Sequence, residues 1–103
     1  PGSFRYVPET DLDTRELREG DVVWFLLNPA HESARRLRDE YGLVIGHIGL
    51  IIEEQGEILL VHAASSDLPG CYVGGRVVKV ALDVYLARVE RFTGVLVTRF
   101  ESP

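Results

Sequence analysis

Methionine is absent from this sequence, and cysteine occurs only once. A single cysteine cannot form an internal disulfide, and it does not supply the paired cysteines of a zinc ribbon. Because the sequence begins at Pro1 without a methionine, we treat it as a piece of a longer protein. We recognise no signal peptide in it, so we expect any such segment to lie upstream.

Positive charge and long apolar runs are also scarce. The chain has 11 lysines and arginines against 16 aspartates and glutamates, which gives a net charge of −5. This acidic balance argues against a nucleic-acid-binding protein, which needs a basic surface. The longest apolar run, residues 48–52, is far shorter than the roughly 18 residues of a membrane-spanning helix. We therefore expect neither nucleic acid as a partner nor a membrane span.

The apolar content suits one small domain. The 103 residues are 46% hydrophobic, which is enough for a single modest core. Apolar runs between turn signals predict strands over residues 22–27, 46–54, 57–64, 76–81 and 94–100. Residues 1–19 are predicted to form an extended lead-in with one helical turn within 11–19, and residues 20–103 form the folded subdomain.

Two helices are predicted, over residues 29–41 and 83–91. In the first, Asn28 is the expected N-cap, Pro29 suits the first helical position, and Gly42 ends the helix in a left-handed conformation. The apolar side of the second helix is expected to carry Leu82, Leu86 and Val89. The predicted fold class is α+β, with a small antiparallel β-sheet or half-barrel and two helices.

The predicted hairpin brings two histidines together. If residues 55–56 form a two-residue turn, His62 lies opposite Gly49 and His47 lies opposite Ala64. The two imidazoles then share one face of the sheet as diagonal neighbours, with small residues beside them. Such a pair suits general-base catalysis, in which His47 takes a proton and His62 orients its ring.

Two other interpretations of these histidines stay open. Strand histidines are often core residues with satisfied polar atoms, and a register slip of one residue would place the two on opposite faces. A zinc site would need His31, His47, His62 and Cys71 to converge. Their spacing matches no zinc motif that we recognise.

Four short motifs follow one another in an order typical of one family. They are Gly-Asp-Val-Val at 20–23, Gly-Leu-Val-Ile-Gly-His-Ile-Gly at 42–49, His-Ala-Ala-Ser-Ser at 62–66 and Thr-Gly-Val-Leu-Val-Thr-Arg at 93–99. Together they resemble the C-terminal half of NlpC-like papain-fold cell-wall hydrolases. The resemblance is closest to the branch of N-acetylmuramoyl-L-alanine amidases long described as a domain of unknown function, and it covers most of the chain from Tyr6 onward.

The resemblance implies an activity on peptidoglycan. It implies cleavage of the amide between the muramic acid lactyl group and L-alanine, or of a neighbouring peptide bond. His47 matches the catalytic base, and His62 matches the third member of a Cys-His-His triad. Ser65 and Ser66 match a segment close to the site and are candidate substrate-binding residues, whereas Asp21 matches a structural turn residue. The family implies a periplasmic or extracellular location, with no cofactor and no metal.

The sequence departs from this family most clearly in its nucleophile. The family cysteine opens a helix upstream of the Gly-Asp turn, and residues 1–19 contain no cysteine. We therefore expect a papain-like core whose Cys-bearing helical half lies outside this chain. The segment His-Ala-Ala-Ser also has one alanine more than the family's simpler His-Ala-Ser, and the helix at 29–41 looks like an insertion.

Two alternative functions stay open. The chain could be a non-catalytic module that binds a muropeptide or a partner, or a circularly permuted cysteine hydrolase that uses Cys71. Catalytic thiols are favoured by a helix N-terminus or a cationic neighbour, and no helix signal follows Cys71. A half-barrel without its other half exposes apolar surface, so we expect this chain to associate with itself or with a Cys-bearing partner chain.

Overall fold

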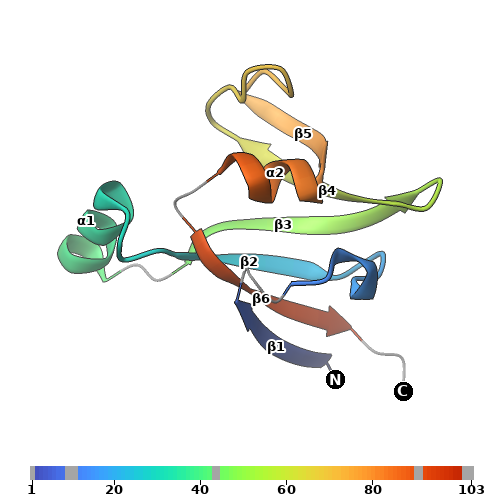
Figure 1. Ribbon diagram of the computed structural model, residues 1–103, viewed down its shortest axis with the longest axis horizontal. Helices are drawn as coiled ribbons and strands as arrows, with labels where there is room; N and C mark the ends of the chain where they lie inside the picture. The colour runs from blue at the N-terminus through green and yellow to red at the C-terminus, as the bar shows by residue number, and fades with distance from the viewer. Residues whose placement is uncertain (1, 9–11, 43–44, 90–91, 101–103) are drawn as a thin grey trace.

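The computed structural model describes residues 2–8, 12–42, 45–89 and 92–100, and the side chains in these ranges except those at 2–8, 33, 41 and 100. It contains a six-stranded antiparallel sheet with the strand order β1-β6-β2-β3-β4-β5 (Figure 1). Two α-helices and a short 3-10 helix connect the strands, which confirms the α+β class. None of the helices within these ranges is long and apolar enough to cross a membrane.

The strands follow the predicted apolar runs, with one addition. They are β1 (Gly2–Pro8), β2 (Val22–Leu27), β3 (Ile45–Glu54), β4 (Glu57–Ala64), β5 (Arg76–Ala81) and β6 (Phe92–Phe100). The bounds of β2, β4 and β5 are those predicted from the sequence. β3 and β6 begin one and two residues earlier than predicted, and β1 was not predicted as a strand.

Alternation along β2 separates the two faces of the sheet. Val23, Phe25 and Leu27 are buried, whereas the residues between them are half-buried. The buried side, here called the inner face, carries the hydrophobic core together with Leu82 and Tyr85 of α2 (Leu82–Arg88). The opposite side is called the outer face. Since β2 lies between β6 and β3, the core is centred on the middle of the sheet.

The β3–β4 hairpin has the predicted turn and register. Gln55 and Gly56 both have positive φ angles, 53° and 80°, as a favoured two-residue hairpin turn requires. Glu54 pairs with Glu57, and the same register continues along both strands towards the histidines. The turn therefore determines which side chains of the two strands share a face.

The expected lead-in contains a paired strand. β1 pairs with β6 along its whole length, from Gly2 opposite Phe100 to Pro8 opposite Gly94. β1 lies at the edge of the sheet, and its pairing with β6 defines it as a strand. The 3-10 helix η2 (Thr14–Glu16) lies within the predicted helical turn, whose residue 11 is outside the described residues.

The first helix starts later than predicted. α1 (Glu32–Tyr41) begins three residues after the expected start, because the Asn28 side chain accepts a hydrogen bond from the Ala30 amide at 3.0 Å. This contact forms a local turn in place of a helix cap. Gly42 ends α1 with a φ angle of 68°, as predicted. The helix projects from one end of the sheet (Figure 1) and buries Ala34 in the core.

The second helix is shorter than predicted. α2 has Val89 as its C-terminal cap, and the predicted positions 90–91 lie outside the described residues, as do positions 43–44 of the second sequence motif. α2 packs against β4 and β5 (Figure 1). This packing covers the end of the inner face that carries the histidines.

The Gly-Asp turn before β2 is held by an arginine from β6. Asp21 is 1% exposed, and its carboxylate accepts hydrogen bonds from Nε and Nη2 of Arg99 at 2.8 and 2.7 Å. Its Oδ2 also accepts a hydrogen bond from the Arg18 amide at 2.9 Å. Burial acts to raise the pKa of Asp21, but these hydrogen bonds and the Arg99 charge outweigh it and hold the pKa below its ordinary value. Asp21 therefore has a structural role, which is to hold the Gly-Asp turn against β6.

Candidate functional site

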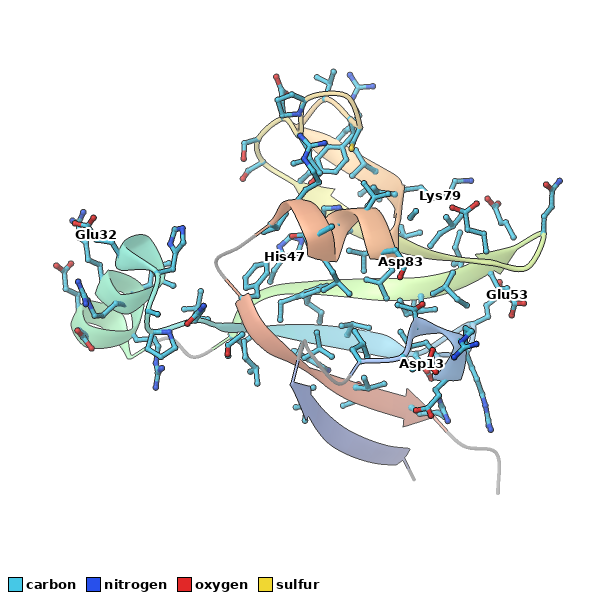
Figure 2. The ribbon with its side chains drawn as sticks, viewed as in Figure 1. Asp13, Glu32, His47, Glu53, Lys79 and Asp83 are labelled. Atoms are coloured by element: carbon cyan, nitrogen blue, oxygen red, sulfur yellow. The ribbon has the colours of Figure 1, made fainter. Side chains whose placement is uncertain are left out.

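Two histidines meet on the inner face of the sheet. His47 comes from β3 and His62 from β4, and Figure 2 shows His47 between β3 and α2. Nε2 of His47 lies 2.6 Å from Nδ1 of His62, and the ring planes meet at 85°. His62 is 4% exposed, whereas His47 is half-buried. The structure thus brings the two histidines into hydrogen-bond contact, as the hairpin register predicted.

Glycines on either side of His47 let β3 lie close to its neighbours. A β-carbon at Gly49 would overlap the side chain of Leu60. A β-carbon at Gly46 would overlap the side chains of Leu27 and Phe92. Larger residues at these two positions would push β3 away from the elements that hold the histidine pair.

Aromatic rings line the histidine pair. They come from Phe25, Tyr72, Tyr85 and Phe92. Tyr85 contacts both histidines, with its ring centroid 6.0 Å from that of His47 and 4.9 Å from that of His62. Tyr72 packs edge-to-face against His62 at 5.3 Å. This apolar wall accounts for the low exposure of His62.

Sequence reasoning did not find these aromatic residues as part of the site. Phe25 was predicted only as one residue of a buried strand, and Tyr72 lies in a loop without any periodic pattern. Tyr85 had a detectable signal, because it lies three residues after Leu82 and shares its face of the helix. The predicted apolar side of α2 omitted it.

The environment of His62 favours its neutral form. Burial, followed by the charge of a protonated His47, lowers the pKa of His62 from its ordinary 6.5 to about 4. The Nδ1 atom of His62 shares the hydrogen bond with His47. Its Nε2 atom is buried and has no hydrogen-bond partner among the described residues. His62 is therefore a neutral hydrogen-bonding group at physiological pH.

This arrangement can hold a proton in a defined place. A neutral imidazole that engages one ring nitrogen of a second imidazole fixes the orientation of that second ring. Here the engaged atom is Nε2 of His47. Proton exchange with a nucleophile would then involve Nδ1 of His47.

The two candidate substrate-binding serines lie next to the site in sequence. Ser65 and Ser66 are exposed and follow β4 directly. The backbone of Ser66 is packed so closely against Gly74 that a β-carbon at Gly74 would overlap it. The amide of Gly74 also donates to Oδ1 of Asp67 at 2.8 Å. These contacts give the loop that begins at Ser65 a closed shape.

Among the described residues, the remaining candidates Cys71 and His31 do not form a metal-binding group with the histidine pair. The hydrogen bond that the structure gives Sγ of Cys71 is with Nη1 of Arg88, at 3.6 Å, and no helix begins at this cysteine. His31 is exposed at the start of α1. Within the described part of the chain, no three His, Cys, Asp or Glu side chains are grouped so that they could hold a metal ion. The four residues considered for zinc therefore do not converge.

No protein-family model and no curated protein matches this sequence. Solved structures do share its fold. Two of them are crystal structures of an N-acetylmuramoyl-L-alanine amidase from Bacteroides uniformis, each with a TM-score of 0.65 and 26% identity, covering 95% of this chain. Another, a proposed xylanase from Bacteroides fragilis, has a TM-score of 0.64 and 27% identity, covering 93% of this chain.

These comparisons define an amidase-like fold related to cell-wall amidases. The chain spans only 36% of the length of each of these solved structures. The matched region therefore corresponds to about a third of those proteins.

Proposed function

We propose that this chain is the histidine-bearing part of a bacterial cell-wall amidase with a papain-like core. Its chemistry would be of the Cys-His-His type, with the cysteine outside this chain. The observation that carries the proposal is the 2.6 Å contact between Nε2 of His47 and Nδ1 of His62. It lies in a fold shared with an N-acetylmuramoyl-L-alanine amidase. A neutral, buried histidine behind a half-buried one is the arrangement that a general base and its orienting partner need.

In this proposal His47 moves the protons of the reaction. Nδ1 of His47 removes the proton from the cysteine thiol, and the thiolate attacks the carbonyl carbon of the lactyl–alanine amide. His47 then gives this proton to the amide nitrogen as the C–N bond breaks, which releases the peptide amine and leaves a thioester on the cysteine. Water deprotonated by His47 cleaves the thioester and restores the thiol. His62 holds the His47 ring throughout.

The proposal also gives a role to the two serines and names a substrate, a location and a partner. Ser65 and Ser66 would contact the substrate, because they are exposed at the end of the strand that carries His62. The substrate would be derived from peptidoglycan, and the protein would act in the periplasm or outside the cell. The partner would be the Cys-bearing half or, failing that, a second copy of this chain.

The experiment that tests the proposal is a hydrolysis assay with the gene product that contains this chain. Purified peptidoglycan is incubated with it before and after alkylation of its thiols, and the released peptides are identified by mass spectrometry. We expect stem peptides with a free N-terminal alanine amine, and loss of this product after alkylation. Hydrolysis that survives complete alkylation would contradict the Cys-His-His chemistry.

Two alternative functions are distinguished in the same assay. If the protein binds muropeptides and hydrolyses none, it is a non-catalytic binding module. If Cys71→Ser abolishes hydrolysis, the enzyme is a permuted cysteine hydrolase. Cys71 has one of the two features that favour a catalytic thiol, a cationic neighbour in Arg88, but no helix begins at this cysteine.

A further inference from the structure

Whether the buried Nε2 atom of His62 carries a proton matters for His47. This Nε2 atom has no hydrogen-bond partner among the described residues, although His62 is only 4% exposed. A buried polar atom without a partner costs about 1–3 kcal/mol. Either the atom is a bare acceptor or it carries a proton that no oxygen or nitrogen accepts. The two cases have different consequences for His47.

The hydrogen bond between the histidines links their protonation states. If Nε2 of His47 donates, then Nδ1 of His62 accepts, and the proton of neutral His62 must be on Nε2. In that state Nδ1 of neutral His47 carries a lone pair and can act as a base. If Nδ1 of His62 donates instead, His47 carries its proton on Nδ1 and cannot take another from a nucleophile there. Only the first state is compatible with a general base at Nδ1 of His47.

Two tyrosine rings pack against the buried ring of His62. The ring of Tyr85 lies 4.9 Å from that of His62 at an interplanar angle of 65°, and the ring of Tyr72 lies at 5.3 Å and 77°. The face of an aromatic ring is electronegative, so it attracts an N–H group and repels a bare nitrogen lone pair. A tyrosine ring that presents its face to Nε2 therefore favours the tautomer with a proton on that atom.

We propose that Tyr72 and Tyr85 are positioning residues that keep the proton of His62 on Nε2. They thereby keep the proton of His47 on its own Nε2, with the lone pair on Nδ1. The catalytic meaning of this tautomer rests on the proposed function, but the tautomer itself is a property of this chain. The rings act as weak hydrogen-bond acceptors at this buried position.

The structure holds both tyrosines firmly against His62. Tyr85 is 2% exposed and is anchored in α2. Tyr72 lies in a tight loop, where its amide and carbonyl both hydrogen-bond to Leu68 at 3.0 Å. The Arg88 guanidinium donates to the Pro69 carbonyl at 2.9 Å and ties this loop to α2.

Among the described residues, three titratable side chains have rings that pack against His62. They are His47 from β3, Tyr72 from the loop and Tyr85 from α2. The residue opposite it on β5 is the apolar Val78. No carboxylate in this set would accept the Nε2 proton. The preference for neutral His62 agrees with its lowered pKa.

The tautomer can be measured directly by NMR of the imidazole nitrogens in this chain at neutral pH. In the wild-type chain we expect Nε2 of both histidines to resonate as protonated nitrogens and Nδ1 of both as bare nitrogens. Tyr72→Phe and Tyr85→Phe keep the rings and should keep this pattern. Tyr72→Leu and Tyr85→Leu remove a ring acceptor, and the His62 Nε2 resonance should shift towards the bare-nitrogen range.

Several outcomes would overturn the inference. The first is a wild-type spectrum with the His62 proton on Nδ1. The second is a pair of folded leucine variants with the wild-type pattern. The third is a phenylalanine variant that switches tautomer, since this would assign the effect to a hydroxyl group. If Tyr85→Leu does not fold, the wild-type spectrum and the Tyr72 variants still decide. None of these results depends on hydrolysis, so this inference and the proposed function can fail separately.

Discussion

At the scale of single residues, the lowered pKa of His62 makes the stability of the fold depend on pH. The unfolded chain binds a proton at this histidine near its ordinary pKa of 6.5, whereas the folded chain binds one only near pH 4. The unfolded state therefore holds more protons within this window, and the free energy of unfolding falls as the pH drops through it. Above pH 6.5 this contribution is fully present.

We expect this titration to remove up to about 3 kcal/mol of stability between pH 6.5 and pH 4. Urea unfolding of the wild-type chain and of His62→Phe, each at pH 7 and pH 4.5, measures the effect. The wild-type chain should lose more stability between the two pH values than the variant, because phenylalanine does not titrate. Equal losses in both would contradict the assignment of a neutral, buried His62.

Asp21 and Glu54 provide a second comparison at the residue scale. Asp21 is buried and receives two hydrogen bonds from Arg99, whereas the pair between Glu54 and Lys79 is about half exposed. Removing one partner of a buried ion pair typically costs about 3–5 kcal/mol, and an exposed pair contributes about 0–1 kcal/mol. We expect Asp21→Ala to lower the free energy of unfolding by about 3 kcal/mol or more and Glu54→Ala by less than about 1 kcal/mol.

Denaturant unfolding at neutral pH measures both variants. The exposed pair is the matched control, because each substitution removes one carboxylate that is paired with a basic side chain. A loss for Asp21→Ala as small as that for Glu54→Ala would show that the Arg99 contact is not a structural anchor.

At the scale of elements, the hairpin turn determines the histidine contact. Gln55 has a φ angle of 53° and Gly56 one of 80°, and left-handed backbone costs roughly 1–2 kcal/mol per residue for side chains other than glycine, asparagine and aspartate. We expect Gly56→Ala to destabilise the chain by about 1 kcal/mol and Gln55→Asn to stabilise it by a few tenths. Thermal unfolding should move in opposite directions for the two variants. A shift of the same sign in both would contradict the turn type.

The elements also show what could be read from the sequence. The two-residue turn sets the register, and period-2 alternation then places His47 and His62 on one face, so the central contact was predictable from short-range rules. The start of α1 was predicted wrongly, because Asn28 can cap a helix or close a local turn and only the packed chain decides between them. β1 was missed because its strand character depends on β6, which lies more than eighty residues away in sequence.

The aromatic residues of the site could not be predicted from the sequence, for a related reason. Tyr72 reaches His62 from a loop whose shape depends on contacts of Leu68 and Arg88. Such contacts have no periodic signature. The resemblance to cell-wall amidases, by contrast, is carried by short motifs that can be recognised directly in the sequence. The fold comparison supports it at the level of an amidase-like fold.

At the scale of the whole molecule, the outer face of the sheet carries several exposed apolar side chains. Ile48 and Leu50 on β3 are 46% and 42% exposed, and Val77 on β5 is 68% exposed. Ile48 pairs with Trp24, which lies on the same face. Contiguous exposed apolar side chains drive association in water. This face is therefore the expected contact surface of the isolated chain.

We expect the isolated chain to self-associate in a concentration-dependent way. Light scattering after size-exclusion chromatography should show a mass above 11.5 kDa for the wild-type chain. The double variant Ile48→Thr with Leu50→Thr should be closer to monomeric. Val84→Thr, which changes an exposed residue of α2, should leave the association unchanged. A wild-type chain that is monomeric at high concentration would contradict the expectation.

The central claim is that His47 is the base of a cell-wall amidase. The most direct test is the rate of peptidoglycan hydrolysis by the gene product that contains this chain, compared between wild type, His47→Ala and His31→Ala. A general base contributes roughly 10²–10⁴-fold to a rate, so His47→Ala should lower the rate by a factor in that range. His31→Ala, at the exposed start of α1, should leave it unchanged. Equal hydrolysis by wild type and His47→Ala would contradict the account.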